Sequence, residues 1–560
     1  MKRAIVRAPG TWMDVLSWAA IIALLATIAL GILVPVYVDE IATKLVQARF
    51  LSEHGEMLSL FPQCASGFVL DTPLTWYPAA LAFSLFYGGL QPVGLRLAGT
   101  ALFLAWLALL AAWLFLTIPE PRRRLRAVAA MAALVGLGVL PLTMVLARPE
   151  QWVVLLLTCY LVLAAGGERA ASRARVLGPA AVLAAFALLT SLLNYSHPKA
   201  LFFLPFVLIC AYYTFGRRRQ WLIGLAAAFS LVSAYQTFEF AKAATRCEEA
   251  PILSGILSSQ TTRVSLAIED PVAFLGEAAS NLASAPGEIA AHGVFQSAYQ
   301  SAWLPPVPFA ASGTFVKTIN LGITGVWYLA FLLAVLLPPV VFFLRPGQDP
   351  DRDRRLLFPA LWIGLVGHLA LYKEWNFYGG APVVAIAGLL LVHGFGRIPE
   401  APRLSRLANG ALVAVLVLAL ASTGVLAAQL GPRLLRAARS GDVVPVNQEL
   451  SLNAFVYAGT RDQIRSLAEE CGLPGDGATR LVVDDLSYFA FTGLHQPMHL
   501  GFLQPSGFGA DIAGRTRDFL SGMQSDGIIA RCSLIPPEFR YQTLQEGNLC
   551  CVDLKDRSYF

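Results

Sequence analysis

Apolar runs long enough to cross a lipid bilayer recur along the first 430 or so residues of this 560-residue chain. A hydrocarbon core of about 30 Å needs about 20 residues of helix, and these runs are roughly 16–26 residues long. Because 56% of the residues are hydrophobic and only 14% are charged, the composition excludes an ordinary soluble protein. The sequence therefore predicts an α-helical polytopic membrane protein.

Clusters of arginine between the apolar runs orient the predicted spans. Placing every cluster on the cytoplasmic side satisfies the positive-inside rule. The clusters occupy residues 2–7, 120–126, 168–175, 216–220, 345–355 and 396–406. This arrangement predicts about eleven transmembrane helices, near 14–38, 94–118, 127–147, 151–166, 178–194, 200–215, 221–241, 319–344, 356–372, 380–396 and 410–430. The segment 74–90 would break the alternation, so we expect an interfacial helix there.

Unusual ionisable residues gather in the links on the opposite, outer side. They are Asp39, Glu40, Asp71, Arg148, Glu150, His197, Lys199, Lys373 and Glu374. Ionisable groups at membrane depth are costly, and they mark functional sites more often than other residues do. We therefore expect one site on the outer face.

The tail differs from the rest of the chain and predicts a second domain. We expect a transmembrane domain over 1–430 and a small periplasmic α/β domain over 431–560, with strands at Leu481–Val483, in "GIIARCSL" and in "NLCCVDL". Six cysteines fall in outer segments, which fits disulfides in an oxidising compartment. They are Cys64, Cys247, Cys471, Cys532, Cys550 and Cys551, with Cys64 and Cys247 as a candidate pair. Arginine greatly outnumbers lysine, which is typical of a GC-rich bacterium, so we expect the bacterial inner membrane.

Several outer segments, in order, resemble a known family. They are "VDEIATKL" after the first span, "DTPLTWYPAALAFSLFYGG" at 71–89, "GLRLAGTALFLAWLALL" at 94–110, "SHPKALFFLP" at 196–205 and "YKEWNFYGGAPVVAIAGLLL" at 372–391. This pattern resembles the polyprenyl-phosphate-dependent glycosyltransferases of the GT-C fold, in particular the lipid A aminoarabinose transferases and the protein O-mannosyltransferases. The chain departs from the family at Asp71–Thr72, where relatives have a lysine before "PPL", and at "RPEQW", where many have an aspartate.

The resemblance implies transfer of a sugar from a polyprenyl-phosphate donor to an acceptor on the periplasmic face. Asp39 is the candidate base that removes the acceptor proton, and Glu40 would orient it, bind the acceptor or raise the pKa of Asp39. Glu150 would share the acceptor or a metal ion with Asp39. Arg148 and Lys199 would hold the lipid phosphate, as Lys373 also could. Further substrate-binding candidates are His197, Trp76 and Tyr378.

Each candidate also has a purely structural interpretation. The Asp39–Glu40 pair could cap the helix that follows, and "RPE" could simply begin a helix. Lys199 and Lys373 could extend to the interface, and His197 could be a turn residue. The histidines of "HQPMH" could ligate a metal, but the proline between them argues against a helix.

Two other functions remain open at this point. The alternative is a transporter or flippase of lipid-linked saccharides, although the sequence has no internal repeat and its charges lie on one side. A non-catalytic assembly protein would leave Asp39 dispensable. For the transferase, the expected partners are the lipid-linked donor, membrane lipid, and a cell-envelope glycan, lipid or protein as acceptor, with no nucleic acid. No cofactor is certain, and a divalent metal ion is a candidate.

Overall fold

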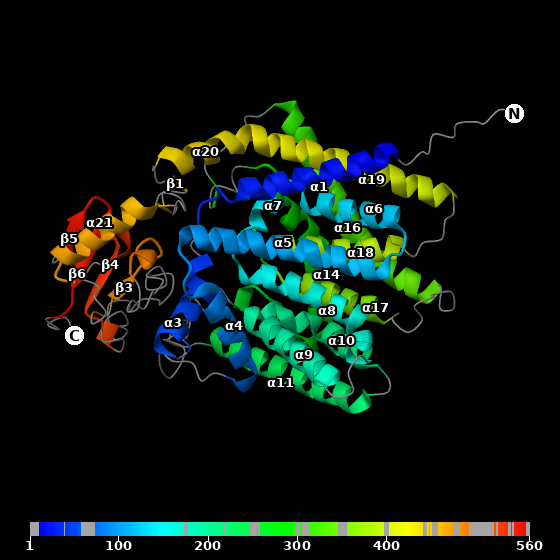
Figure 1. Ribbon diagram of the computed structural model, residues 1–560, viewed down its shortest axis with the longest axis horizontal. Coiled ribbons are helices and arrows are strands. Elements are labelled where there is room, and N and C mark those ends of the chain that lie inside the picture. Colours follow the sequence, from blue (N-terminus) through cyan, green and yellow to red (C-terminus); the bar gives the residue numbers. More distant parts are fainter. Residues whose placement is uncertain are drawn as a thin grey trace.

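In the computed structural model, long helices run side by side and a small sheet lies beyond one end of them (Figure 1). The structure describes residues 11–37, 40–55, 57, 73–172, 177–216, 219–246, 255, 258–296, 303–304, 313–344, 356–396, 402–440, 445–446, 449–450, 457–473, 479, 481–491, 520–521, 525–535, 539 and 543–555. Within these ranges, eight helices are long and apolar enough to cross a membrane. The chain is therefore a multi-pass helical membrane protein with a small C-terminal sheet region.

Most helices of the bundle overlap a predicted span, and α14 does not. The helices are α1 (Thr11–Gly31), α5 (Pro92–Thr117), α6 (Pro121–Val135), α7 (Leu140–Thr143), α8 (Pro149–Ser172), α9 (Leu177–Ser196), α10 (Leu204–Phe215), α11 (Gln220–Thr245), α14 (Pro271–Gly293), α16 (Thr314–Leu344), α17 (Leu357–Leu371), α18 (Gly380–Gly396) and α19 (Pro402–Val425). Of these, α17 and α18 are apolar but shorter than the eight candidate spans.

The predicted span 127–147 is not a continuous helix. It is divided into α6 and the short α7 by Gly136 and Gly138, and Gly138 has a positive φ of 60°. A side chain at Gly138 would also collide with the carbonyl of Gly293, which accepts a hydrogen bond from the backbone N–H of Val139 at 2.9 Å. Only glycine tolerates both the left-handed backbone and this close approach.

The chain between α11 and α16 contains a helix that is not among the predicted spans. The structure has the four-residue α13 (Leu266–Glu269) and then α14, a helix of 23 residues that packs on α16 and α17. Pro286 lies inside α14. The outer loop therefore contributes a full helix to the bundle.

Short helices gather at the end of the bundle that carries the sheet (Figure 1). They are the π-helix η1 (Ile41–Leu45), α3 (Val46–His54), the 3-10 helix η3 (Leu74–Trp76) and α4 (Tyr77–Tyr87). The segment 74–90 is thus a short helix at the bundle end, as predicted, and not a span. Another 3-10 helix, η4 (Pro198–Phe203), links α9 to α10.

The C-terminal region begins with a helical extension of α19. The π-helix η8 (Leu426–Leu430) and α20 (Gly431–Ser440) continue it, so the predicted boundary at residue 431 falls inside a helical run. Further along lie β1 (Pro445–Val446), β2 (Glu449–Leu450), α21 (Tyr457–Glu470), β3 (Leu481–Val483), η9 (Tyr488–Ala490), β4 (Gly527–Arg531), η11 (Cys532–Leu534), β5 (Thr543–Glu546) and β6 (Leu549–Asp553). The sheet order is β3-β4-β6-β5, with only β3 and β4 parallel. The three predicted strands are confirmed as β3, β4 and β6, and β5 is the fourth strand of this sheet.

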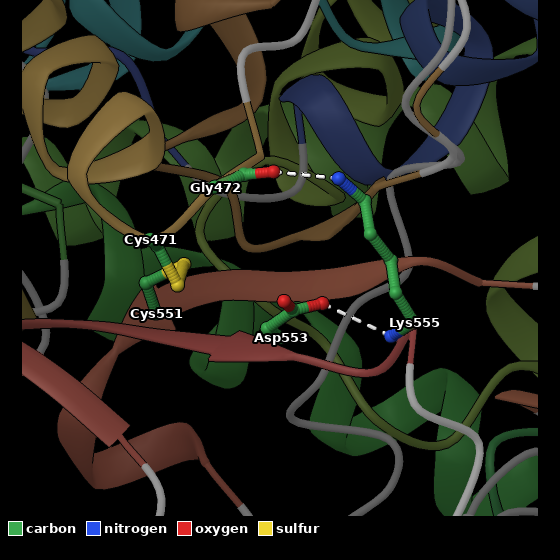
Figure 2. Close-up of a disulfide and its surroundings, with 5 residues drawn as sticks. All are labelled: Cys471, Gly472, Cys551, Asp553 and Lys555. Atoms are coloured by element: carbon green, nitrogen blue, oxygen red, sulfur yellow. Dashed lines mark hydrogen bonds between the residues drawn. A yellow bond between two sulfur atoms is a disulfide. The ribbon is translucent and has the colours of Figure 1, made fainter.

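Two disulfides hold this region together. Cys550 and Cys551 are consecutive on β6, so their side chains point to opposite faces of the sheet. They reach different partners, Cys532 and Cys471 respectively. In Figure 2 the Cys471–Cys551 bond ties the end of α21 to β6. Beside it, Nζ of Lys555 donates to the Gly472 carbonyl at 2.6 Å. The predicted pair Cys64 and Cys247 lies outside the described residues.

Arg49 of α3 connects the bundle to the C-terminal region. Its guanidinium donates to the carbonyls of Gly88 and Leu90 at 3.2 and 3.1 Å and to that of Phe491 at 3.4 Å. It also lies 4.6 Å from the ring centre of Tyr488. Because Arg49 is buried, these contacts fix the sheet region against the short helices.

Helix ends that border different arginine clusters meet at one end of the bundle. There Arg122 pairs with Asp14 near the start of α1, and Trp113 of α5 packs on Phe358 and His393. The start of α1 lies far from the sheet region (Figure 1). These described helix ends are therefore grouped as the predicted alternation of spans requires.

Candidate functional site

Glu40 anchors the segment that follows α1. Its carboxylate receives hydrogen bonds from the Arg96 guanidinium at 3.1 and 2.7 Å, from the backbone N–H of Tyr37 at 2.8 Å and from that of Ala147 at 2.6 Å. Both side chains of the Glu40–Arg96 pair are fully buried.

Arg96 completes this anchor from α5. It donates to the carbonyls of Val34, Pro35 and Val145 at 3.0, 2.8 and 3.0 Å. Gly99, one turn further along α5, lets the 145–147 segment approach, because a Cβ there would collide with the Val145 carbonyl. Such a pair fixes where the chain after α1 meets the chain before α8.

These contacts give Glu40 a structural role. Four donors already occupy its two oxygens, so the carboxylate positions the backbone next to Asp39. Its predicted part in catalysis stays a prediction, and the contacts do not favour it. Asp39 and Asp71 themselves lie outside the described residues.

A second group of charges lies where α8 begins and where α9 ends. Glu150 Oε2 is 3.4 Å from Nε of Arg148, and Oε1 is 3.5 Å from Nε2 of His197 and 3.9 Å from Nζ of Lys199. Arg148, Glu150 and Lys199 are buried, and the His197 side chain is 24% exposed. Four residues that the sequence predicted for one site therefore do meet, and we call them the Glu150 cluster.

Local sequence explains how these four side chains are presented. Pro149 occupies the first turn of α8, where its missing N–H costs nothing, and Gln151 accepts from the backbone N–H of Arg148 at 2.7 Å. His197 precedes Pro198 and caps η4, with Nδ1 accepting from the backbone N–H of Lys199 at 3.0 Å. The "RPE" and "HPK" segments are thus helix starts, and they also bring their charges together.

Aromatic rings support both cations of the Glu150 cluster. The Arg148 guanidinium lies 4.0 Å from the ring centre of Tyr378, and Nζ of Lys199 lies 4.4 Å from that of Tyr372. Tyr37, two residues before Asp39, packs near Tyr378 with ring centres 6.3 Å apart. The segment that leads to Asp39 is therefore close to the Arg148 side of the cluster.

The electrostatics of the cluster leave it positive. Burial lowers the pKa of His197 to about 3, and the Lys199 and Arg148 charges lower it further against the opposing effect of Glu150. The ring is neutral at neutral pH, so its Nδ1 is free to accept the Lys199 N–H. Among the residues that the structure describes, two cations then face one carboxylate. A buried excess of positive charge is suited to an anionic ligand.

Two other predicted residues have different surroundings. Lys373 forms its ion pair with Glu277 of α14, so among the described contacts it does not join the Glu150 cluster. Trp76 is buried against Tyr195 and Phe240, which makes it part of an aromatic core and not an exposed binding surface. Both assignments stay predictions, and the described contacts of neither side chain include Arg148.

Lys44 is a residue that the sequence reasoning missed. It lies in η1, its Nζ is 3.6 Å from the ring centre of Tyr195, and its charge acts on His197. The signal was available, since this lysine belongs to the "VDEIATKL" segment. No group of three or more potential metal-ligating side chains occurs within the described ranges, and the "HQPMH" histidines lie outside them.

Comparisons with known proteins find a likeness among solved structures. No protein-family model and no curated protein sequence matches the chain. Its structure is similar to the crystal structure of ArnT from Cupriavidus metallidurans bound to undecaprenyl phosphate, at 13% sequence identity. The match covers 97% of this chain and 98% of that one, with a TM-score of 0.42. A likeness at this level says nothing about what the chain binds.

Proposed function

We propose that this chain is a GT-C type membrane glycosyltransferase that moves a sugar from a polyprenyl-phosphate donor to an acceptor. The observation that carries the proposal is the Glu150 cluster, where the buried cations Arg148 and Lys199 face one carboxylate at the end of the bundle away from the arginine-rich links. A lipid phosphate is an anion whose hydrocarbon chain stays in the membrane, so it can bring its negative charge to cations at the end of a helix bundle.

Arg148 and Lys199 hold the donor phosphate in different ways. The planar guanidinium can bind two phosphate oxygens at once, and the ammonium acts as a point charge. The Tyr378 ring packs against the Arg148 guanidinium and the Tyr372 ring against the Lys199 ammonium, and these contacts would keep both cations in place. Hydrogen bonds from these groups strengthen as negative charge develops on the leaving phosphate, which lowers the barrier to transfer.

Asp39 is the proposed base. The acceptor hydroxyl oxygen attacks the anomeric carbon, the bond between that carbon and the phosphate oxygen breaks, and its electron pair stays on the phosphate. The hydroxyl proton passes to the Asp39 carboxylate. Glu40 and Arg96 would fix the backbone beside Asp39, and Glu150 would share the acceptor with Asp39.

We place the reaction on the periplasmic face of a bacterial inner membrane, with the C-terminal region on that same side. Supporting this, helix ends that border arginine-rich links meet at the opposite end of the bundle, and positively charged links favour the cytoplasm. The disulfides of the C-terminal region are typical of an oxidising compartment. The acceptor is then a cell-envelope glycan, lipid or protein.

The experiment is transfer from a panel of radiolabelled polyprenyl-phosphate sugars to cell-envelope acceptors, in vesicles. Wild type is compared with Asp39→Asn and with the matched control Asp14→Asn, which changes an aspartate at the opposite end of the bundle. We expect wild type and Asp14→Asn to consume a donor, and Asp39→Asn to lose at least a hundredfold in rate.

Other outcomes would change the proposal in defined ways. Normal turnover by Asp39→Asn would show that the Asp39–Glu40 pair is structural and that another group is the base. Movement of an intact lipid-linked sugar across the vesicle membrane, with no transfer, would establish the transporter function instead.

A further inference from the structure

Lys44 is a half-buried cation without a carboxylate partner among the described residues. Its Nζ donates to Oε1 of Gln47 at 3.2 Å and lies over the Tyr195 ring at 3.6 Å. Neither contact carries a negative charge. Burial lowers the pKa of Lys44 to about 7, so the folded protein holds this ammonium at a cost. A methionine or leucine would fill the same space without that cost.

The position of Lys44 relates it to the Glu150 cluster. Tyr195, which lies under Lys44, is two residues before His197 at the end of α9. The charges of Lys44, Lys199, Arg148 and Glu150 all act on the His197 ring. Lys44 comes from η1, Arg148 from the start of α8 and Lys199 from η4, so three separate elements each carry a cation whose charge acts on this histidine.

The charges of the proposed site balance only when Lys44 is counted. Protonated Lys44, Arg148 and Lys199 would offset Glu150, the proposed base Asp39 and the one negative charge of the donor. A lipid-linked sugar phosphate is a phosphodiester and carries one negative charge. When its bond to the sugar breaks, the electron pair remains on phosphate, and the product is a phosphomonoester with a second negative charge.

We propose that Lys44 is a further catalytic residue, which stabilises the second negative charge that forms on the leaving phosphate. This inference rests on the proposed function. An interaction that strengthens only as the bond breaks accelerates the reaction more than one that binds donor and product equally. Arg148 and Lys199 would neutralise the single charge of the donor, and Lys44 would respond to the charge that the reaction adds.

The test compares two soluble probes that differ by this one charge. Farnesyl phosphate is a monoester, and its methyl ester, methyl farnesyl phosphate, is a diester of nearly the same shape. Their binding to purified full-length protein at pH 6.5 is measured for wild type, Lys44→Gln, Lys44→Arg and the control Lys242→Gln. Lys242 forms its ion pair with Glu239 on α11, outside the site.

We expect wild type, Lys44→Arg and Lys242→Gln to bind the monoester at least tenfold more tightly than the diester. Lys44→Gln should bind the diester as wild type does and lose most of that preference. If Lys44→Gln keeps the preference, or loses affinity for both probes equally, Lys44 is a structural residue and the inference is wrong. Failure of wild type to bind either probe would overturn the proposed function itself, and this inference with it.

Folding of the variants is checked by thermal unfolding in detergent. If Lys44→Gln does not fold, Lys44→Met, which keeps the aliphatic stem over Tyr195, replaces it in the same comparison.

Discussion

Glu40 and Arg96 form a fully buried ion pair between the segment after α1 and the second helix of the bundle, 2.7 Å apart at the closest atoms. Among the described residues, the two side chains form hydrogen bonds only with each other and with backbone groups. A buried pair of this kind stabilises mainly because losing one partner leaves the other charge uncompensated. It therefore fixes where the chain after α1 meets the chain before α8.

Removing Arg96 should unfold or strongly destabilise the protein. We expect Arg96→Ala to lose about 3–5 kcal/mol of unfolding free energy, because Glu40 would remain buried and charged. Glu40→Gln keeps the shape of the side chain and some of its hydrogen bonds, so this variant should be more stable than Arg96→Ala. The yield of monodisperse protein and the thermal midpoint in detergent measure this. A Glu40→Gln protein that is as stable as wild type but inactive would show instead that Glu40 takes part in catalysis.

Removing the carboxylate of Glu150 should raise the affinity for an anion. Glu150 neutralises part of the charge on Arg148 and Lys199, so it competes with the ligand for them. We expect Glu150→Gln to bind farnesyl phosphate about tenfold more tightly, which is about 1.4 kcal/mol. Glu239→Gln, on the exposed part of α11, is the control and should match wild type. Weaker binding by Glu150→Gln would mean that the carboxylate is needed to arrange the two cations.

His197 should act as a helix cap that does not need a charge. His197→Ala removes the acceptor for the Lys199 backbone N–H and should cost about 0.5–2 kcal/mol, whereas His197→Asn can still accept. The pKa of about 3 in the folded state lies below the ordinary value of 6.5. Between these values only the unfolded chain takes up the proton, so acid reduces stability through His197 below about pH 6.5.

The measurement for His197 is thermal unfolding between pH 8 and pH 5. Wild type should lose stability as the pH falls below about 6.5, and His197→Asn should lose less over the same range, since asparagine does not titrate. Equal losses in the two proteins would show that His197 is charged, and not neutral, in the folded state.

Binding of a phosphomonoester should pass through a maximum near neutral pH. The second ionisation of a phosphate ester has a pKa of about 6, so the ligand gains charge as the pH rises through that value. Lys44, with a pKa of about 7, loses its charge as the pH rises further. Titration of wild type with farnesyl phosphate should give the highest affinity between about pH 6 and 7. In Lys44→Arg, affinity should no longer fall above pH 7; a fall of the same size would assign the loss to another group.

The two disulfides should contribute unequally to the stability of the C-terminal region. The Cys471–Cys551 bond spans 80 residues and the Cys532–Cys550 bond spans 18. A longer loop loses more chain entropy when it is closed in the unfolded state, which favours the first bond by about 1.3 kcal/mol. Paired serine variants, Cys471→Ser with Cys551→Ser and Cys532→Ser with Cys550→Ser, are compared by proteolysis of this region. Faster cleavage of the second pair would contradict the loop-length explanation.

The sequence by itself determined the layout of this protein. Apolar runs need helices in a membrane, because a backbone without water must form its own hydrogen bonds, and this fixed most of the spans. Arginine-rich links predicted which helix ends lie together, and contacts such as Trp113 with His393 agree. Local patterns also predicted the strands at Leu481–Val483 and in "NLCCVDL", and the structure confirms them.

Only the tertiary structure decided which charges meet. Glu40 pairs with a residue 56 positions away, and Lys373 joins Glu277 on a helix that the sequence did not predict as one element. Lys44 turns toward Tyr195 near the Glu150 cluster, whereas nothing in its own segment says which way it points. Periodicity and composition act over one helix, and the partner of a buried side chain depends on how separate helices pack. That is why the spans could be read from the sequence and the site only in part.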